Sequence, residues 1–171
     1  MKPKTAGRVG SEHCPTGHDA PRDHRFAGLV SGAQILTLKG ERPVETLRTG
    51  DHVLTRSGAV PVTRIDIVSV IAPAVYVIAG SLGHSRPDRD ALLTAHQTIH
   101  LRDWRALAFC GANNALVEAA CLVDGEFVRD LGQQLVTLHR IFCAAPQVIY
   151  ADGLELGTAD TAGVPGFTRA I

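Results

Sequence analysis

Short apolar segments separated by frequent turn signals constrain the fold of this 171-residue chain more than any other feature. Turn-forming residues recur about every eight to twelve positions, which is the spacing of short strands in all-β domains. Between them apolar side chains alternate, as at Val60 and Val62 and again at Ile65 and Ile67. No segment keeps a helical period over several turns. The pattern therefore predicts an all-β sandwich or barrel-like fold.

The strands expected from this pattern are bounded by Gly, Pro and charged residues. They span 33–38, 44–47, 52–55, 60–70, 75–79, 92–101, 126–129, 135–142 and 147–151. Pro73 is expected to break the long apolar run that precedes it. Residues 82–90 have the composition of a loop, and residues 115–122 that of a short helix or a single helical turn.

Composition excludes several classes of partner. Lysine plus arginine and aspartate plus glutamate are balanced at 17 each, so we expect neither nucleic acid nor an anionic membrane as a partner. No apolar run approaches the roughly 20 residues of a membrane-spanning helix. The first residues lack the apolar core of a signal peptide, which favours a cytoplasmic location and leaves open export without an N-terminal signal.

The two ends of the chain differ from its middle. Residues 1–26 are predicted to be a disordered polar tail and residues 159–171 a flexible tail, with one domain at 27–158. The first tail contains His13, Cys14, His18 and His24, which are weak candidates for metal ligands. Their spacing matches no familiar closed site, so we expect no metal and no cofactor. The four cysteines contain no C-x-x-C pair, which favours free thiols.

Several segments, in order and spacing, carry a family resemblance. They are Gly28-Leu-Val-Ser-Gly-Ala-Gln-Ile-Leu-Thr37, Pro43-Val-Glu-Thr-Leu-Arg-Thr-Gly-Asp51, Ile78-Ala-Gly-Ser-Leu-Gly83, Leu92-Leu-Thr-Ala-His-Gln-Thr-Ile99, Leu116-Val-Glu-Ala, Leu122-Val-Asp-Gly and Val148-Ile-Tyr-Ala-Asp-Gly153. Together they resemble a Hint domain of the bacterial type, the hedgehog/intein self-processing module. The resemblance implies a horseshoe of short strands with two related halves and a central processing site. A weak internal echo of Val44-Glu45 in Val117-Glu118 agrees with two such halves.

The family's reaction begins with a nucleophile on the residue that supplies the scissile nitrogen, because only that side chain reaches the preceding carbonyl through a small ring. The resemblance places Gly28 at this position, and glycine has no side chain. Ser31 is the nearest hydroxyl, but it could attack only the Val30–Ser31 bond and lies too close to Ile35 for the family spacing. We expect Ser31 to be a turn residue before Gly32.

The second requirement is a histidine that protonates the leaving amine. The family motif T-x-x-H begins here at Thr94, and its last position is Gln97, which cannot titrate. If the segment is extended, His96 and His100 point away from Gln97. A one-residue bulge that turns His96 inward is the remaining possibility.

The third requirement is a late-acting polar group near the end of the domain. Cys143 and His139 are candidates by residue type, whereas the matching stretch at 144–147 is nonpolar. A histidine on an apolar strand is more often a core residue, and a lone cysteine is more often a small buried hydrophobe. We therefore expect no catalytic residue.

The sequence thus predicts a degenerate, noncatalytic Hint-fold module with a binding or structural role. The alternative is an active autoproteolytic domain that cleaves near Gly28 through an unconventional nucleophile such as Ser31, His96 or Cys143. A metal-responsive tail is a third possibility. A protein partner and the oligomeric state remain open at this stage.

Overall fold

The structure is a computed structural model that describes residues 26–159, which form two antiparallel sheets. The four-stranded sheet has the order β1 (Leu29–Val30), β10 (Val128–Phe142), β6 (Arg64–Val77) and β7 (Ala91–Thr94). The eight-stranded sheet has the order β3 (Gly40–Pro43), β2 (Gln34–Thr37), β4 (His52–Thr55), β11 (Val148–Ala151), β12 (Leu154–Gly157), β8 (Thr98–Leu101) and β9 (Ala115–Glu118), with β5 (Gly58–Pro61) paired to β4. The prediction of an all-β fold is confirmed.

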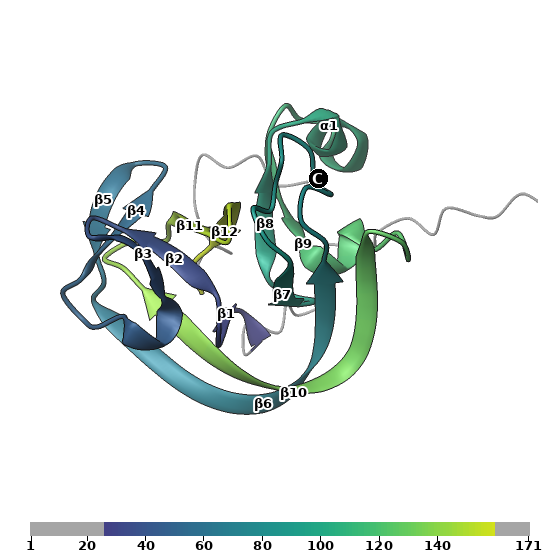
Figure 1. Ribbon diagram of the computed structural model, residues 1–171. Coiled ribbons are helices and arrows are strands. Elements are labelled where there is room, and N and C mark those ends of the chain that lie inside the picture. Colours follow the sequence, from purple (N-terminus) through teal and green to yellow (C-terminus); the bar gives the residue numbers. More distant parts are fainter. Residues whose placement is uncertain (1–25, 160–171) are drawn as a thin grey trace, which may run out of the picture.

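The long strands β6 and β10 form an arc beneath the rest of the molecule (Figure 1). They pair from Arg64↔Phe142 to Val77↔Val128, with one register shift between Asp130 and Gly132. Val136 and Leu138 face a small buried cluster, whereas Leu135 is exposed and Thr137 is half-buried. This alternation is the period-two pattern that the sequence shows.

Two lobes rise from this arc and give the predicted horseshoe (Figure 1). One lobe contains β2 to β5, and the other contains β7 to β9 with the α-helix α1 (Trp104–Cys110). The hairpin β11–β12 joins the lobes, because β11 pairs with β2 and β4 whereas β12 pairs with β8. No helix within residues 26–159 is long and apolar enough to cross a lipid bilayer.

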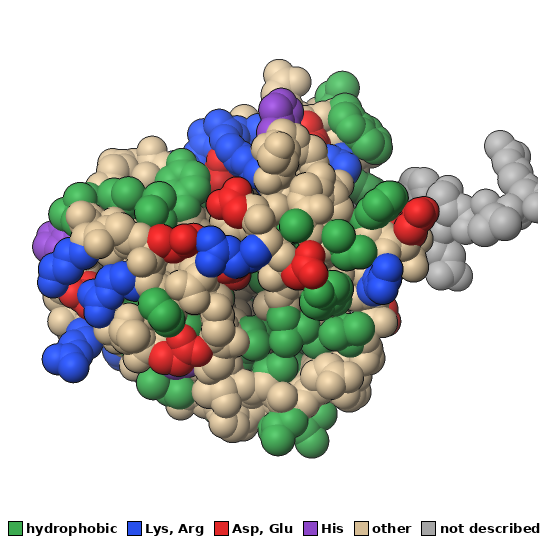
Figure 2. All heavy atoms as spheres, in the orientation of Figure 1, with side chains coloured by type: hydrophobic (Ala, Val, Ile, Leu, Met, Phe, Trp, Pro, Cys, Tyr) green, Lys and Arg blue, Asp and Glu red, His purple; other side chains and the backbone are tan. Residues whose placement is uncertain are grey.

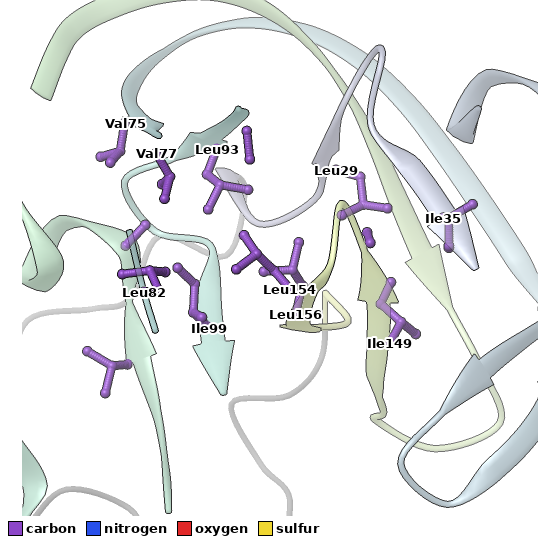
Figure 3. Packing of buried hydrophobic residues seen from close by; sticks show 14 of the residues in the cluster. Leu29, Ile35, Val75, Val77, Leu82, Leu93, Ile99, Ile149, Leu154 and Leu156 are labelled. Atoms are coloured by element: carbon purple, nitrogen blue, oxygen red, sulfur yellow. The ribbon is translucent and has the colours of Figure 1, made fainter. Parts of the chain in front are cut away.

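The main core extends through both lobes. Figure 3 shows buried side chains from β1, β2, β6, β7, β8, β11 and β12 that belong to one cluster. Leu29, Leu154 and Leu156 are each 2% exposed or less. Because Leu29 directly follows Gly28, the packing of β1 into this core fixes the position of Gly28.

Three of the strand predictions are wrong. Residues 44–46 form the 3-10 helix η2 (Val44–Thr46) instead of a strand, because Val44 and Leu47 are three positions apart and both must be buried. Pro73 does not interrupt β6; it lies beside the β10 bulge, where the β6–β7 ladder ends, so its missing N–H is tolerated. Residues 92–101 form β7 and β8, separated by a turn at 95–97.

Other elements were missed or only partly anticipated. Residues 115–122 divide into β9 and the 3-10 helix η3 (Ala119–Leu122). Helix α1 was missed because its seven residues are too few for a periodic signal, although Asp103 caps its start and Gly111, with φ +65°, ends it. Strands β1 and β12 are too short or too uniformly buried to show alternation.

Candidate functional site

Gly28 is buried at the start of β1, where that strand meets β10. Its φ is +157°, a value that residues with side chains rarely adopt. A Cβ atom built on Gly28 would lie 3.2 Å from the His139 carbonyl oxygen and 3.2 Å from Cγ of Arg140. A side chain at position 28 would therefore require β10 to shift by a few tenths of an ångström.

Gln97 contacts the nitrogen of Gly28 directly. Its Oε1 accepts a hydrogen bond from the Gly28 N–H at 3.0 Å, and its side chain is fully buried. The same amide donates from Nε2 to the Gly157 carbonyl at 2.9 Å and to the Thr98 carbonyl at 3.1 Å. One side chain thus connects the entry to β1, the start of β8 and the end of β12.

Thr94 approaches the same segment from the other direction. Its Oγ1 donates to the carbonyl of Phe26, two residues before Gly28, and the side chain is buried. Thr94 and Gln97, the first and last residues of the T-x-x-Q segment, therefore contact the chain on the two sides of the Ala27–Gly28 bond. The segment is not extended, however: the Gln97 N–H bonds the Thr94 carbonyl at 3.0 Å across a tight turn.

Neither nearby histidine replaces Gln97. His96 stacks on the ring of Phe26 at 5.9 Å, and its Nδ1 lies 3.4 Å from a Glu118 oxygen. His100 is buried against Glu155, with 2.7 Å between Nδ1 and Oε2. We expected both histidines to point away from Gln97 because side chains alternate along an extended backbone. The backbone turns at 95–97 instead, and the contacts of each ring with its own partners keep both histidines away from Gln97.

Ser31 and His139 are brought together although they are 108 residues apart. The Ser31 Oγ lies 2.9 Å from Nε2 of His139, and His139 is buried. Ser31 is also a turn residue, as predicted, because the Ala33 N–H bonds the Val30 carbonyl at 3.1 Å and Gly32 has φ +95°. Burial lowers the pKa of His139, although the Glu45 charge opposes this shift.

Comparison with known proteins identifies the family. A sequence model described as Hint domain matches residues 27–161. The chain belongs to the Hint domain family. No curated protein matches the chain. Similar solved structures include a bacterial intein-like domain from Clostridium thermocellum, with 15% identity, a TM-score of 0.51, and coverage of 77% of this chain and 98% of that one.

A DnaB intein from Synechocystis sp. PCC 6803 is also similar, with 11% identity, a TM-score of 0.52, and coverage of 77% of this chain and 99% of that one. At such identities the likeness establishes the fold alone. The match of the Hint domain model confirms the resemblance to this family that the sequence motifs carry.

The remaining candidates lie away from the Hint site or outside the described residues. Cys143 is buried and carries a free thiol, as does the half-buried Cys110. Cys121 is disulfide-bonded, so the expectation of free thiols is wrong for this residue, because sequence spacing does not show which thiols a fold brings together.

The candidate metal ligands of the N-terminal tail, namely His13, Cys14, His18 and His24, lie outside the described residues. Within residues 26–159 no cluster of metal-ligating side chains is present.

Sequence reasoning did not find two features of this Hint site. The Gly157 carbonyl, at the end of β12, binds Gln97, and backbone groups leave no signal in the sequence. The register Leu29↔His139 between β1 and β10 brings Ser31 to His139, and strand register across so long a separation cannot be read from local pattern.

Proposed function

We propose that this chain is a noncatalytic Hint-fold module that has lost self-processing and keeps a binding or structural role. The observation that carries the proposal is the contact between Gly28 and Gln97. The residue before which cleavage would occur has no side chain, and its nitrogen is held by an amide oxygen that cannot deliver a proton.

The chemistry of an acyl shift shows why both positions matter. The first step needs a side-chain oxygen or sulfur that attacks the Ala27 carbonyl, and Gly28 supplies neither. The second needs an acid that protonates the departing nitrogen. Gln97 accepts a hydrogen bond from that nitrogen and uses its N–H groups on the Gly157 and Thr98 carbonyls. The polar contacts of the site therefore hold the backbone together.

One observation favours a second candidate function, which is autoproteolysis at the Val30–Ser31 bond. The 2.9 Å contact between the Ser31 hydroxyl and Nε2 of His139 is the geometry of a nucleophile and its general base. The lowered pKa of His139, caused mainly by burial, favours the neutral imidazole that could accept the hydroxyl proton. Against this candidate, Ser31 donates its N–H to the Thr137 carbonyl at 2.9 Å, so its nitrogen belongs to an ordinary sheet contact.

The intact mass of the purified chain separates these candidates. The chain is incubated for a day alone, with a thiol that would cleave a thioester, and with hydroxylamine that would cleave an ester. An unchanged mass in all three samples supports the noncatalytic proposal, and a fragment that begins at Gly28 overturns it. A fragment that begins at Ser31, is lost in Ser31→Ala and persists in the matched control Ser69→Ala would establish the second candidate.

A further inference from the structure

A pocket between the loop before β7, strand β8 and strand β12 lies outside the Hint site. It has a volume of about 320 Å³, and its lining includes Arg86, His100, Arg102 and Glu155. Arg56 contacts Glu155 from the turn between β4 and β5. We propose that this Glu155 pocket binds a small oxyanion ligand, specifically the phosphate group of a phosphate monoester. The inference does not depend on whether the chain processes itself.

Glu155 organises the pocket as a buried anchor for arginine side chains. Its side chain is completely inaccessible to solvent. Oε2 accepts from Nη1 of Arg56 at 2.9 Å and from Nδ1 of His100 at 2.7 Å, and Oε1 accepts from Nη1 of Arg86 at 3.0 Å and from Nη2 of Arg102. Each oxygen therefore accepts two hydrogen bonds, and each guanidinium is tethered to the carboxylate by one of its nitrogens.

The charges at the pocket do not balance. The carboxylate of Glu155 faces three guanidinium groups, and the other acidic residue of the lining, Asp103, pairs with Arg105 at 2.7 Å. Four guanidinium groups against two carboxylates leave an excess of two positive charges. Figure 2 shows basic side chains gathered at the upper edge of the molecule with acidic side chains beside them.

The charge states of Glu155 and His100 agree with this excess of two positive charges. Burial raises the pKa of Glu155, but the hydrogen bonds from Arg56, His100 and Arg86 outweigh it and hold the pKa below its ordinary value. Burial lowers the pKa of His100, which favours the neutral ring. A neutral ring that donates from Nδ1 to Glu155 cannot also accept from Arg56, so the Arg56 nitrogen 3.1 Å away remains directed at the carboxylate.

The arginines retain donors for a ligand. Their side chains are 34% exposed for Arg56, 38% for Arg86 and 46% for Arg102, so the anchored groups still reach solvent. Each guanidinium has further N–H donors in a planar fork that matches two oxygens of a phosphate. Because Glu155 already tethers the three guanidinium groups, a ligand would lose less conformational entropy in ordering them.

Size and charge select the class of ligand. A phosphate monoester carries about two negative charges at pH 7, which matches the excess of two positive charges. The pocket lies near the lower end of the roughly 300–1,000 Å³ range of small-molecule sites. A polyanion such as nucleic acid would need a wider basic surface, which the balanced composition of the chain does not provide.

The test is calorimetric titration of the full chain with phenyl phosphate, and separately with inorganic phosphate and benzoate, at constant ionic strength and pH 7.5. We expect saturable 1:1 binding of phenyl phosphate and of inorganic phosphate, with benzoate at least ten-fold weaker. Arg102→Gln is expected to weaken phenyl phosphate binding at least ten-fold, whereas Arg129→Gln, on the exposed part of β10, leaves it unchanged.

Circular dichroism shows whether Arg102→Gln is folded, and Arg86→Gln replaces it if it is not. Absence of phosphate binding by the native chain would overturn the proposal. Equal binding by the native chain and both pocket variants would also overturn it, because the effect would then be a general salt effect. Benzoate binding as tight as phenyl phosphate would refute the phosphate assignment. None of these outcomes changes the intact mass of the chain, so they are separate from the test of self-processing.

Discussion

Replacement of Gln97 by methionine should destabilise the fold strongly, although the change removes only one polar side chain. Methionine has a similar length and keeps the site filled, so the change removes mainly the polar contacts. Two buried hydrogen bonds and a part-buried one to the Thr98 carbonyl are lost, and the Gly28 N–H and the Gly157 carbonyl are left without their partner. Each of these two buried groups costs about 1–3 kcal/mol when it loses its partner, so the free energy of unfolding should fall by about 2–6 kcal/mol.

Urea denaturation of the purified chain, followed by circular dichroism, measures this loss. The matched control is Gln133→Met, because Gln133 lies on the exposed part of β10 and its replacement should change stability by less than about 0.5 kcal/mol. A loss for Gln97→Met as small as that of the control would refute the reasoning that Gln97 ties β1, β8 and β12 together.

Three further predictions concern other positions. Gly28→Cys should lower the free energy of unfolding by about 1–3 kcal/mol, because its Cβ would lie 3.2 Å from the His139 carbonyl oxygen, and should leave the chain uncleaved by thiols; urea denaturation and intact mass test this, and a thiol-dependent fragment would contradict it. Glu155→Gln should lower the free energy of unfolding by about 3 kcal/mol at pH 6, and this difference from the native chain should shrink below about pH 4. The lowered pKa of Glu155 stabilises the fold above the unfolded-state pKa, and this contribution is lost as the pH falls through the folded-state pKa. A pH-independent difference between the urea midpoints would refute this prediction. Asp124→Ala should cost about 1–2 kcal/mol, because the Asp124 carboxylate accepts three backbone N–H groups at 126–128; an unchanged urea midpoint would show that this turn does not need the carboxylate.

The fold class could be predicted because it depends on local pattern. The strand at 52–55 was placed with its observed bounds, since a hairpin turn follows it directly. The wrong strand prediction at 44–47 also arose from local pattern. The spacing of three positions between Val44 and Leu47 indicates a helical turn, but it was interpreted as part of a strand. Pro73 was misjudged because the bulge that accommodates it lies on β10, far away in the sequence.

The site could be predicted only where a motif marks it. The resemblance to the family motif that begins at Thr94 singled out Gln97, and the structure brings its side chain to Gly28. Nothing local indicates that Ser31 contacts His139, or that Glu155 collects arginines from three separate loops. These pairings depend on the register of distant strands, which local pattern does not encode.

The hairpin β11–β12 also determines when the domain can fold during its synthesis. It lies at the centre of the eight-stranded sheet, between β4 of one lobe and β8 of the other, yet it is the last part of the described chain to be made. Until Gly157 has left the ribosome, the edges of β4 and β8 that it covers remain open to other chains. The eight-stranded sheet can therefore be completed only after this last hairpin has been made.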